Sequence, residues 1–223
     1  MIIAVHQPNY LPYPGFFKKM DQCDLFVIYD DAQFNGRDFQ HRNRIKTFQG
    51  WKWLTVPVEK KSIPINEIRI KNELNKKDMR WQDVHFSEIN RNYKDTQYFH
   101  IYKDKIKDIY DQTYTKLIDL NLSLINSLSH AFNIKTKTIL SSELGLNSKS
   151  TQRLVDIIRV LDGDTYLSGP IGDEYQDIQL FDNNGINVIY QDFTYPTYKQ
   201  LYGEFILNLS AIDVLFNAGV LRT

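Results

Sequence analysis

The sequence has little cysteine, no net charge and no long apolar run, and each of these features excludes some kinds of site or classes of protein. Its one cysteine, Cys23, excludes an intrachain disulfide and a cysteine-cluster metal site, so a reducing compartment is the simplest interpretation. The 27 basic and 27 acidic residues balance, which gives no bulk attraction to nucleic acid or to a membrane surface. No apolar run approaches the roughly 20 residues that span a bilayer, and the start lacks a secretory-signal pattern. We therefore expect a cytoplasmic protein that binds neither nucleic acid nor membrane.

Short apolar runs alternate with helix-like segments near both ends of the 223-residue chain. Such alternation is typical of βαβ units, so we predict an α/β fold with a mainly parallel central sheet. Helical spacing from about residue 76 to 133 interrupts the alternation and predicts a helical layer or insert within a single domain, 1–223. Strands are expected at 2–6, 25–29, 51–58, 63–70 (an edge strand, because of its proline), 136–140, 164–167 and 187–190, and the stretch 34–47 is expected to be irregular.

His6 closes the first apolar run and is followed by a Pro/Asn turn. This pattern puts the histidine at the carboxyl end of a strand, where open α/β sheets bind ligands. An imidazole there can bond to a phosphate or act as acid or base near neutral pH. The alternative is a structural histidine that caps the turn.

Asp30 and Asp31 follow the second apolar run in the same way. Paired carboxylates at a strand end can bind a metal, accept a proton from an amine or hold a sugar hydroxyl. Aspartate is also common in strand-end turns, so a structural role stays open for both residues.

The segment Arg37-Asp38-Phe39-Gln40-His41-Arg42-Asn43-Arg44-Ile45-Lys46 concentrates basic side chains in an otherwise neutral protein. Arginine forks match phosphate and carboxylate geometry, so the cluster predicts an anionic ligand. The alternatives are a solvated loop and a structural network built with the interleaved polar residues.

Two further motifs carry weaker signals. The Ser168–Gly172 turn follows a strand and can present backbone N–H groups to an anion, although it has neither the P-loop ending nor a nucleophile elbow. Ser210 and Gly219 are expected to cap a short helix at its two ends, a structural role. His85, His100 and His130 lack partners at metal-ligand spacing, so no metal ligand is predicted.

Four motifs, in order, resemble the WbqC-like family over essentially the whole chain: His6–Pro12, Arg37–Lys46, Tyr166–Pro170 and Asn208–Gly219. Two positions depart from the family pattern: Tyr13-Pro14 replaces a tryptophan-centred turn, and His41 stands where asparagine is common. The resemblance implies an enzyme encoded among bacterial surface-polysaccharide (O-antigen type) genes. It further implies modification of amino sugars, with N-acyl or aminoacyl transfer onto a nucleotide-linked amino sugar as the leading reaction.

The opening of the chain is also similar to nucleotidylyltransferase-like (HUP) folds, in which a His-containing turn meets nucleotide phosphates. The second histidine of their signature is absent here, so Mg²⁺-dependent nucleotidyl transfer is an alternative, as is a non-catalytic nucleotide-sugar-binding protein.

Under the leading interpretation, His6 is the base, and Asp30 or Asp31 is its partner or the anchor of the amine. The expected substrate-binding residues are Gln7, Asn9, Tyr10, Gln33, Arg37, Gln40, Arg42, Asn43, Arg44, Ser168 and Gly169. The expected partners are a nucleotide-sugar substrate and an acyl or aminoacyl carrier protein; the sequence names no cofactor. Cys23 is expected to be buried, which disfavours a thioester route through it.

Overall fold

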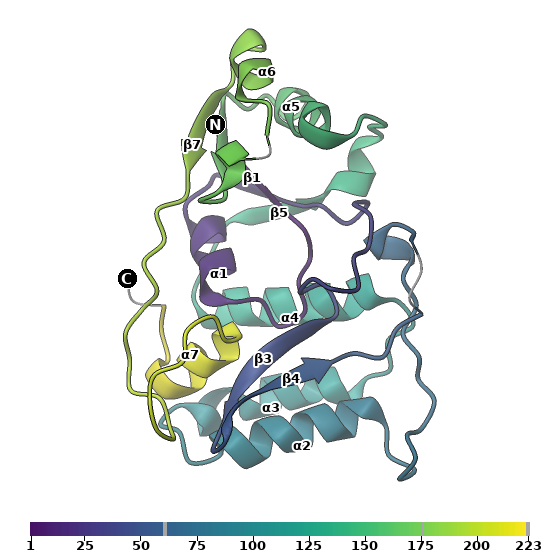
Figure 1. Ribbon diagram of the computed structural model, residues 1–223, viewed down its shortest axis with the longest axis vertical. Helices are drawn as coiled ribbons and strands as arrows, with labels where there is room; N and C mark the ends of the chain where they lie inside the picture. Colours follow the sequence, from purple (N-terminus) through teal and green to yellow (C-terminus); the bar gives the residue numbers. More distant parts are fainter. Residues whose placement is uncertain (60–61, 175, 222–223) are drawn as a thin grey trace. The chain divides into compact units, whose positions relative to one another are not determined.

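The computed structural model describes residues 1–59, 62–174 and 176–221 and has an α/β fold (Figure 1). Its central sheet has five strands in the order β5-β2-β1-β6-β7, and every neighbouring pair runs parallel. These strands are β1 (Ile2–His6), β2 (Leu25–Ile28), β5 (Lys137–Leu140), β6 (Thr165–Ser168) and β7 (Asn187–Tyr190). The predicted fold class is therefore confirmed.

Seven α-helices lie within the described residues: α1 (Pro14–Asp21), α2 (Trp81–Tyr93), α3 (Phe99–Asp111), α4 (Leu117–Ala131), α5 (Ser150–Val160), α6 (Ile178–Asn183) and α7 (Ala211–Ala218). Three 3-10 helices accompany them: η1 (Ile65–Glu67), η2 (Ser141–Leu144) and η3 (Gly172–Glu174). The predicted helical region at about 76–133 is formed by α2, α3 and α4. None of the helices in the described part of the chain has the length and apolar character that crossing a membrane requires.

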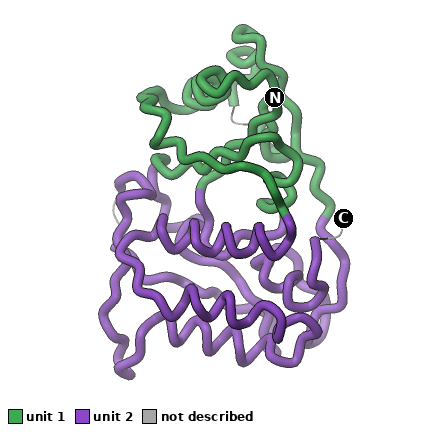
Figure 2. Tube along the Cα trace, turned by 180° about the vertical axis from the view of Figure 1, so that it is seen from behind, with its two compact units in different colours: residues 1–7, 15–32, 134–194 green, residues 8–14, 33–133, 195–223 purple. Residues whose placement is uncertain are grey.

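Contacts divide the chain into two compact units, which Figure 2 colours separately. Unit 1 comprises residues 1–7, 15–32 and 134–194 and contains the parallel sheet. Unit 2 comprises residues 8–14, 33–133 and 195–223 and contains α2, α3, α4, α7 and a hairpin of β3 (Arg42–Thr47) and β4 (Gly50–Thr55).

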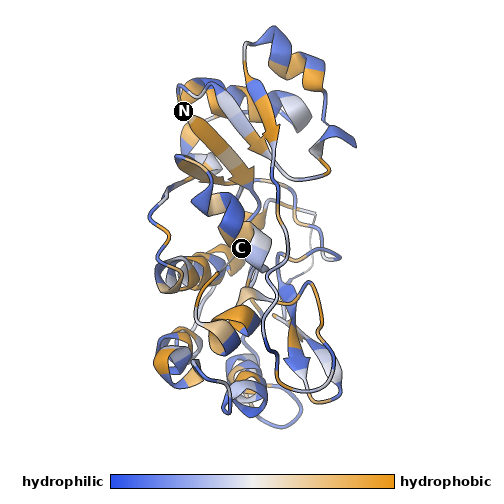
Figure 3. Ribbon diagram, turned by 90° about the vertical axis from the view of Figure 1, so that its left-hand side faces the viewer, coloured by the Kyte–Doolittle hydropathy of each residue, from blue (hydrophilic) through white to orange (hydrophobic). Residues whose placement is uncertain are grey.

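The core of unit 1 forms because its strands are short and almost wholly apolar. Ile3 and Val27 pack in one buried cluster with Val155 and Ile158 of α5 and Phe181 of α6. Strands that are buried on both faces read as continuous apolar runs rather than alternating ones, and the β1 segment is correspondingly orange in Figure 3. Helix α1 adds Phe16, whose ring meets that of Phe26 on β2 at 5.1 Å.

The order of the strands reverses beside β1. From β1 the chain passes to β2 and then β5 on one side, whereas β6 and β7 lie on the other side. Pairing between β1 and β6 runs from Ile2 with Thr165 to Ala4 with Leu167 and stops before the carboxyl ends of both strands. We call Val5, His6, Ser168 and Gly169 the switch-point edge, because open α/β sheets bind ligands where the strand order reverses.

Unit 2 packs three amphipathic helices around a buried seam. Helix α4 buries Leu117, Leu120, Leu124 and Leu128 at helical spacing. The turns of these helices alternate between blue and orange in Figure 3, as amphipathic helices do. Helix α7 has the predicted residues Ser210 and Gly219 as its N-cap and C-cap, and the φ of Gly219, 75°, is left-handed.

Two local predictions are wrong. The stretch 34–47 was expected to be irregular, yet Arg42–Thr47 is a strand paired antiparallel with β4. Burial alternates along this strand, because Arg42 and Arg44 are half-buried whereas Asn43 and Ile45 are buried. The sequence does not show this alternation as apolar and polar residues, because the half-buried positions are charged. The edge strand expected at 63–70 is instead a 3-10 turn, η1, flanked by isolated bridges at Pro64 and Ile70.

Candidate functional site

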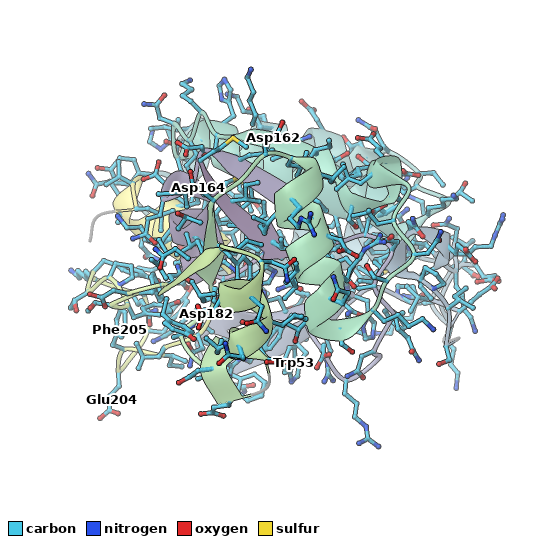
Figure 4. The ribbon with its side chains drawn as sticks, turned by 90° about the horizontal axis from the view of Figure 1, so that it is seen from above. Trp53, Asp162, Asp164, Asp182, Glu204 and Phe205 are labelled. Carbon is cyan, nitrogen blue, oxygen red and sulfur yellow. The ribbon has the colours of Figure 1, made fainter. Side chains whose placement is uncertain are left out.

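Three of the predicted motifs share one edge of the sheet. His6 ends β1, Asp30 and Asp31 follow β2, and Ser168 ends β6. These strands are neighbours and parallel, so all three carboxyl ends lie at the same edge. Asp164, labelled in Figure 4, precedes β6 at the opposite edge, where its carboxylate pairs with the N-terminal ammonium of Met1.

His6 is held as a neutral imidazole with a defined tautomer. Its Nδ1 lies 2.8 Å from the carbonyl oxygen of Gln7, which only accepts, so Nδ1 carries the proton and Nε2 carries the lone pair. The ring of Phe16 packs edge-on against it, with centroids 4.9 Å apart. Burial, and then the charge of Lys19, lower the pKa of His6 to about 4. His6 is therefore uncharged at neutral pH, with its lone pair on Nε2.

Lys19 is a candidate residue that the sequence interpretation missed. The residue is 3% exposed, and its Nζ donates to the Val5 carbonyl at 3.0 Å. Nζ also lies 5.9 Å from the centre of the Tyr166 ring on β6. Burial lowers the pKa of this amine to about 8. The signal was available, because Lys19 comes three residues after Phe16 on the apolar stripe of α1.

The Ser168 turn is compact on one side and open on the other. Ser168 is fully buried, and its hydroxyl donates to Oε1 of Gln176 at 3.1 Å. A Cβ at Gly172 would collide with the Ser168 hydroxyl, so only glycine fits there. A Cβ at Gly169, by contrast, would meet nothing within 4 Å. The backbone of Gly169 therefore borders open space at the switch-point edge.

Asp30 and Asp31 hold other parts of unit 1. Asp30, 1% exposed, accepts hydrogen bonds from the Ser142 N–H at 3.0 Å, the Ser142 hydroxyl at 2.7 Å and the Ser141 hydroxyl at 3.1 Å. Asp31 accepts from Ser141 and forms an ion pair with Arg153 of α5, whose side chain is 3% exposed. Both carboxylates thereby fasten the η2 region and α5 to the end of β2. The predicted partnership with His6 stays a prediction, since the Nδ1 bond of His6 goes to Gln7.

The first family motif begins in unit 1 and continues in unit 2. Gln7 provides the carbonyl that orients His6, whereas Asn9 and Tyr10 are buried in unit 2. The Tyr10 hydroxyl lies 2.8 Å from Nδ1 of His85 and also bonds to Tyr110. The contacts of Tyr10 are those of a core residue.

Backbone and amide bonds join the first motif to the arginine segment within unit 2. Asn43 donates to the Leu11 carbonyl at 2.7 Å, and Asn121 bridges the carbonyls of Pro8 and Gln40 at 2.9 and 2.8 Å. The Gln40 side chain accepts from the backbone N–H of Asn35 at 2.8 Å. The exposed Gln33 bonds to Ser62. Gln40 and Asn43 therefore shape the segment that carries the arginines.

Arg42 and Arg44 stack on tryptophans of the hairpin. The Arg42 guanidinium lies 4.5 Å from the centre of the Trp53 ring, and that of Arg44 lies 5.2 Å from Trp51; Trp53 is labelled in Figure 4. Arg44 also donates to the Asn208 carbonyl at 2.8 Å, and Arg42 to that of Arg37, an exposed residue. Neither guanidinium pairs with a carboxylate among residues 1–59, 62–174 and 176–221, so both charges are available to an anion.

Lys46, which the sequence grouped with these arginines, has a different environment. It is buried, and its ammonium donates to Gln200 at 2.9 Å and to the Glu204 carbonyl. Nearby, the buried carboxylate of Asp213 accepts from Tyr93 at 2.8 Å and Tyr198 at 2.7 Å, and burial raises its pKa. This network stabilises the interior of unit 2, where sequence analysis foresaw only a helix cap.

Two clefts in unit 2 contain none of the predicted site residues. One, of about 430 Å³, is lined by Trp51, Lys52, Glu88 and Arg91 among others, and one of about 230 Å³ by Tyr98, Tyr198 and Asn217 among others. No group of three or more His, Cys, Asp or Glu side chains suited to a metal occurs in the described parts of the chain. Cys23 is buried, as expected, and burial raises its thiol pKa to about 12.

Comparison with known proteins agrees with the four motifs. Residues 7–223 match the family described as the WbqC-like protein family. The chain is similar to "Uncharacterized protein Rv1507c" of Mycobacterium tuberculosis (strain ATCC 25618 / H37Rv), with 36% identity over 219 residues that cover 97% of this chain and 94% of that protein. No solved structure matched the chain. The chain belongs to the WbqC-like protein family.

Proposed function

We propose that the switch-point edge is the active site of an N-acyl or aminoacyl transferase that acts on a nucleotide-linked amino sugar in bacterial surface-polysaccharide biosynthesis. The observation that carries the proposal is His6, a neutral imidazole with its lone pair on Nε2, at the end of β1 where the strand order reverses. Ligands bind at this position in open α/β sheets. The sugar and the pathway follow from the family resemblance.

The proposed chemistry uses His6 as a general base. The uncharged form of the sugar amine attacks the acyl carbonyl carbon, and Nε2 accepts the proton that the nitrogen, now positively charged, gives up. A C–N bond forms, the bond from the carbonyl to the oxygen or sulfur of the donor breaks, and the proton on Nε2 passes to that leaving atom. The Gln7 carbonyl, 2.8 Å from Nδ1, stabilises the imidazolium that forms in between.

The oxyanion formed in this reaction needs a hydrogen-bond donor. The Ser168–Gly172 turn is proposed to supply it, because a Cβ at Gly169 would meet nothing within 4 Å, which leaves open space beside this turn. Within unit 2, Arg37, Arg42 and Arg44 are proposed to bind phosphate, supported by the two guanidiniums that lack carboxylate partners among the described residues. An acyl or aminoacyl carrier protein is the proposed donor partner.

A single-turnover assay tests the proposal. Uridine-diphosphate-linked amino sugars are incubated with carrier-bound acyl donors, or with ATP and free acids, and the products are identified by mass. Transfer by wild type that is lost in His6→Ala and kept in His100→Ala, a change at an exposed histidine, supports it. Mg²⁺-dependent release of pyrophosphate without N-acylation would favour nucleotidyl transfer, and binding without turnover would favour a nucleotide-sugar-binding protein. Either result would overturn the proposal.

A further inference from the structure

The hydrogen-bond ladder between β1 and β6 stops before the Val5 carbonyl, and Lys19 donates to this carbonyl in place of a strand N–H. The carbonyls of Ile2 and His6 accept from Asp24 and Tyr29 on the β2 side. Carbonyls alternate direction along a strand, so that of Val5 points toward β6. Extending the register by one pair would let the Gly169 N–H donate to Val5. Instead, the Lys19 ammonium donates to this carbonyl at 3.0 Å.

The Lys19 ammonium has spare hydrogen-bonding capacity. An ammonium has three N–H donors, and the Val5 carbonyl takes one of them. No carboxylate in the described ranges 1–59, 62–174 and 176–221 pairs with Lys19. The Gly169 N–H, displaced from the ladder, likewise has no backbone acceptor within these ranges. Two donor groups with unused N–H bonds therefore meet the same strand end.

A buried cation without an anion costs folding free energy, and the Val5 carbonyl and the Tyr166 ring offset only part of this cost. A residue selected for stability alone would be apolar here, as Phe16 and Met20 are on the same face of α1. An anionic ligand would supply the missing countercharge.

We infer that the Lys19 ammonium and the Gly169 N–H together bind a phosphoryl group of the substrate at the switch-point edge. The inference rests on the proposed active site there. A phosphoryl group fits because its oxygens accept several N–H bonds at once and carry enough charge to balance the ammonium. A phosphate at Lys19 would also offset the charge that acts on His6, which makes the base stronger once substrate is bound.

Isothermal titration calorimetry with UDP, inorganic pyrophosphate and uridine tests the inference. The variants are Lys19→Met, which keeps the side-chain volume, and Lys18→Met, a control on the half-buried neighbour. Wild type should bind UDP and pyrophosphate but not uridine. Lys19→Met should weaken UDP binding by about 10- to 100-fold, Lys18→Met should not, and ligand-free Lys19→Met should unfold at the same or a higher temperature than wild type.

Protonation gives a second measurement that needs no variant. The groups facing the Lys19 amine are His6 from β1, Tyr166 from β6 and Cys23 after α1. With the pKa values of His6 at about 4 and Cys23 at about 12, neither changes its protonation near pH 8, where Lys19 titrates. UDP binding at pH 8 should therefore take up a fraction of a proton, measured by repeating the titration in buffers of different ionisation enthalpy.

Several results would overturn the inference: equal UDP affinity in Lys19→Met and wild type, binding of uridine as tight as UDP, absence of UDP and pyrophosphate binding, or failure of Lys19→Met to fold. A failure of this inference can be distinguished from a failure of the proposed function. Lys19-dependent UDP binding without acyl transfer keeps the phosphoryl site and removes the transferase. Acyl transfer that persists in Lys19→Met keeps the transferase and removes the phosphoryl site.

Discussion

His6 and Lys19 are linked through the end of β1: the Lys19 ammonium donates to the carbonyl of Val5, the residue before His6. Burial first, and the charge of Lys19 second, lower the pKa of the His6 imidazole. The base and the cation of the proposed site therefore act on each other. Under the proposed function, this coupling connects substrate binding with proton transfer.

His6→Ala should remove acyl transfer while leaving the protein folded. Loss of a general base lowers rates by about 10²- to 10⁴-fold, and His6 lies at a strand end where its ring is only partly buried. The measurement is single-turnover transfer together with the unfolding temperature. Normal turnover would contradict the catalytic role, and an unfolded variant would show that His6 is structural.

Acid should destabilise the protein, in part through His6 and His85. Burial lowers their pKa values from 6.5 to about 4 and about 3, so below pH 6.5 the unfolded state binds protons that the folded state does not. Stability is full above pH 6.5 and falls as the pH drops toward 4, by at most about 1.4 kcal/mol per pH unit for each histidine. Urea unfolding at pH 7, 6 and 5 should show a shallower decline in His6→Asn than in wild type or His100→Asn. An equal decline in all three would contradict the low pKa of His6.

Asp31→Asn should destabilise the fold, because it leaves the buried Arg153 guanidinium without its carboxylate. Breaking a buried ion pair typically costs about 3–5 kcal/mol. The control is Asp83→Asn, which breaks an exposed pair with Arg80 and should cost less than about 1 kcal/mol. Unfolding by urea measures both. An Asp31→Asn protein that is as stable as wild type but inactive would contradict this structural role and would indicate that Asp31 takes part in catalysis.

Nucleotide ligands should stabilise the protein, and the stacked arginines should contribute. A ligand at about 100 times its Kd adds roughly 2.7 kcal/mol to the free energy of unfolding. A thermal-shift series with UDP should show smaller shifts in Arg42→Ala and Arg44→Ala than in wild type or Arg69→Ala, a change at an exposed arginine. Equal shifts in all four proteins would place the anion away from the β3–β4 hairpin.

Local sequence pattern predicted the fold class and the edge of the sheet, but not the partners of the site residues. His6 was placed correctly because an apolar run followed by a turn defines a strand end without any tertiary information. The roles of Asp30 and Asp31 depend on Ser141, Ser142 and Arg153, which lie more than a hundred residues away in the chain. No local pattern encodes such pairings.

Strand β3 and the buried Lys19 were not predicted because both depend on tertiary packing. Strand β3 was overlooked because its arginines pack their guanidiniums on Trp51 and Trp53, so charged residues fill half-buried positions. Lys19 was overlooked because two adjacent lysines, Lys18 and Lys19, do not show in the sequence which of them is buried. Only the packing of α1 shows that one of the two is buried.

The most direct test of the site is nuclear magnetic resonance of the five histidine rings, labelled with ¹⁵N and titrated from pH 8 to 4 with and without UDP. We predict that His6 is a neutral Nδ1–H tautomer down to about pH 4 without ligand. With UDP, its ring resonances should shift and its pKa should rise, while the exposed His100 and His130 stay unchanged. A His6 ring that titrates near 6.5, or that does not respond to UDP while another histidine does, would contradict an active site at the switch-point edge.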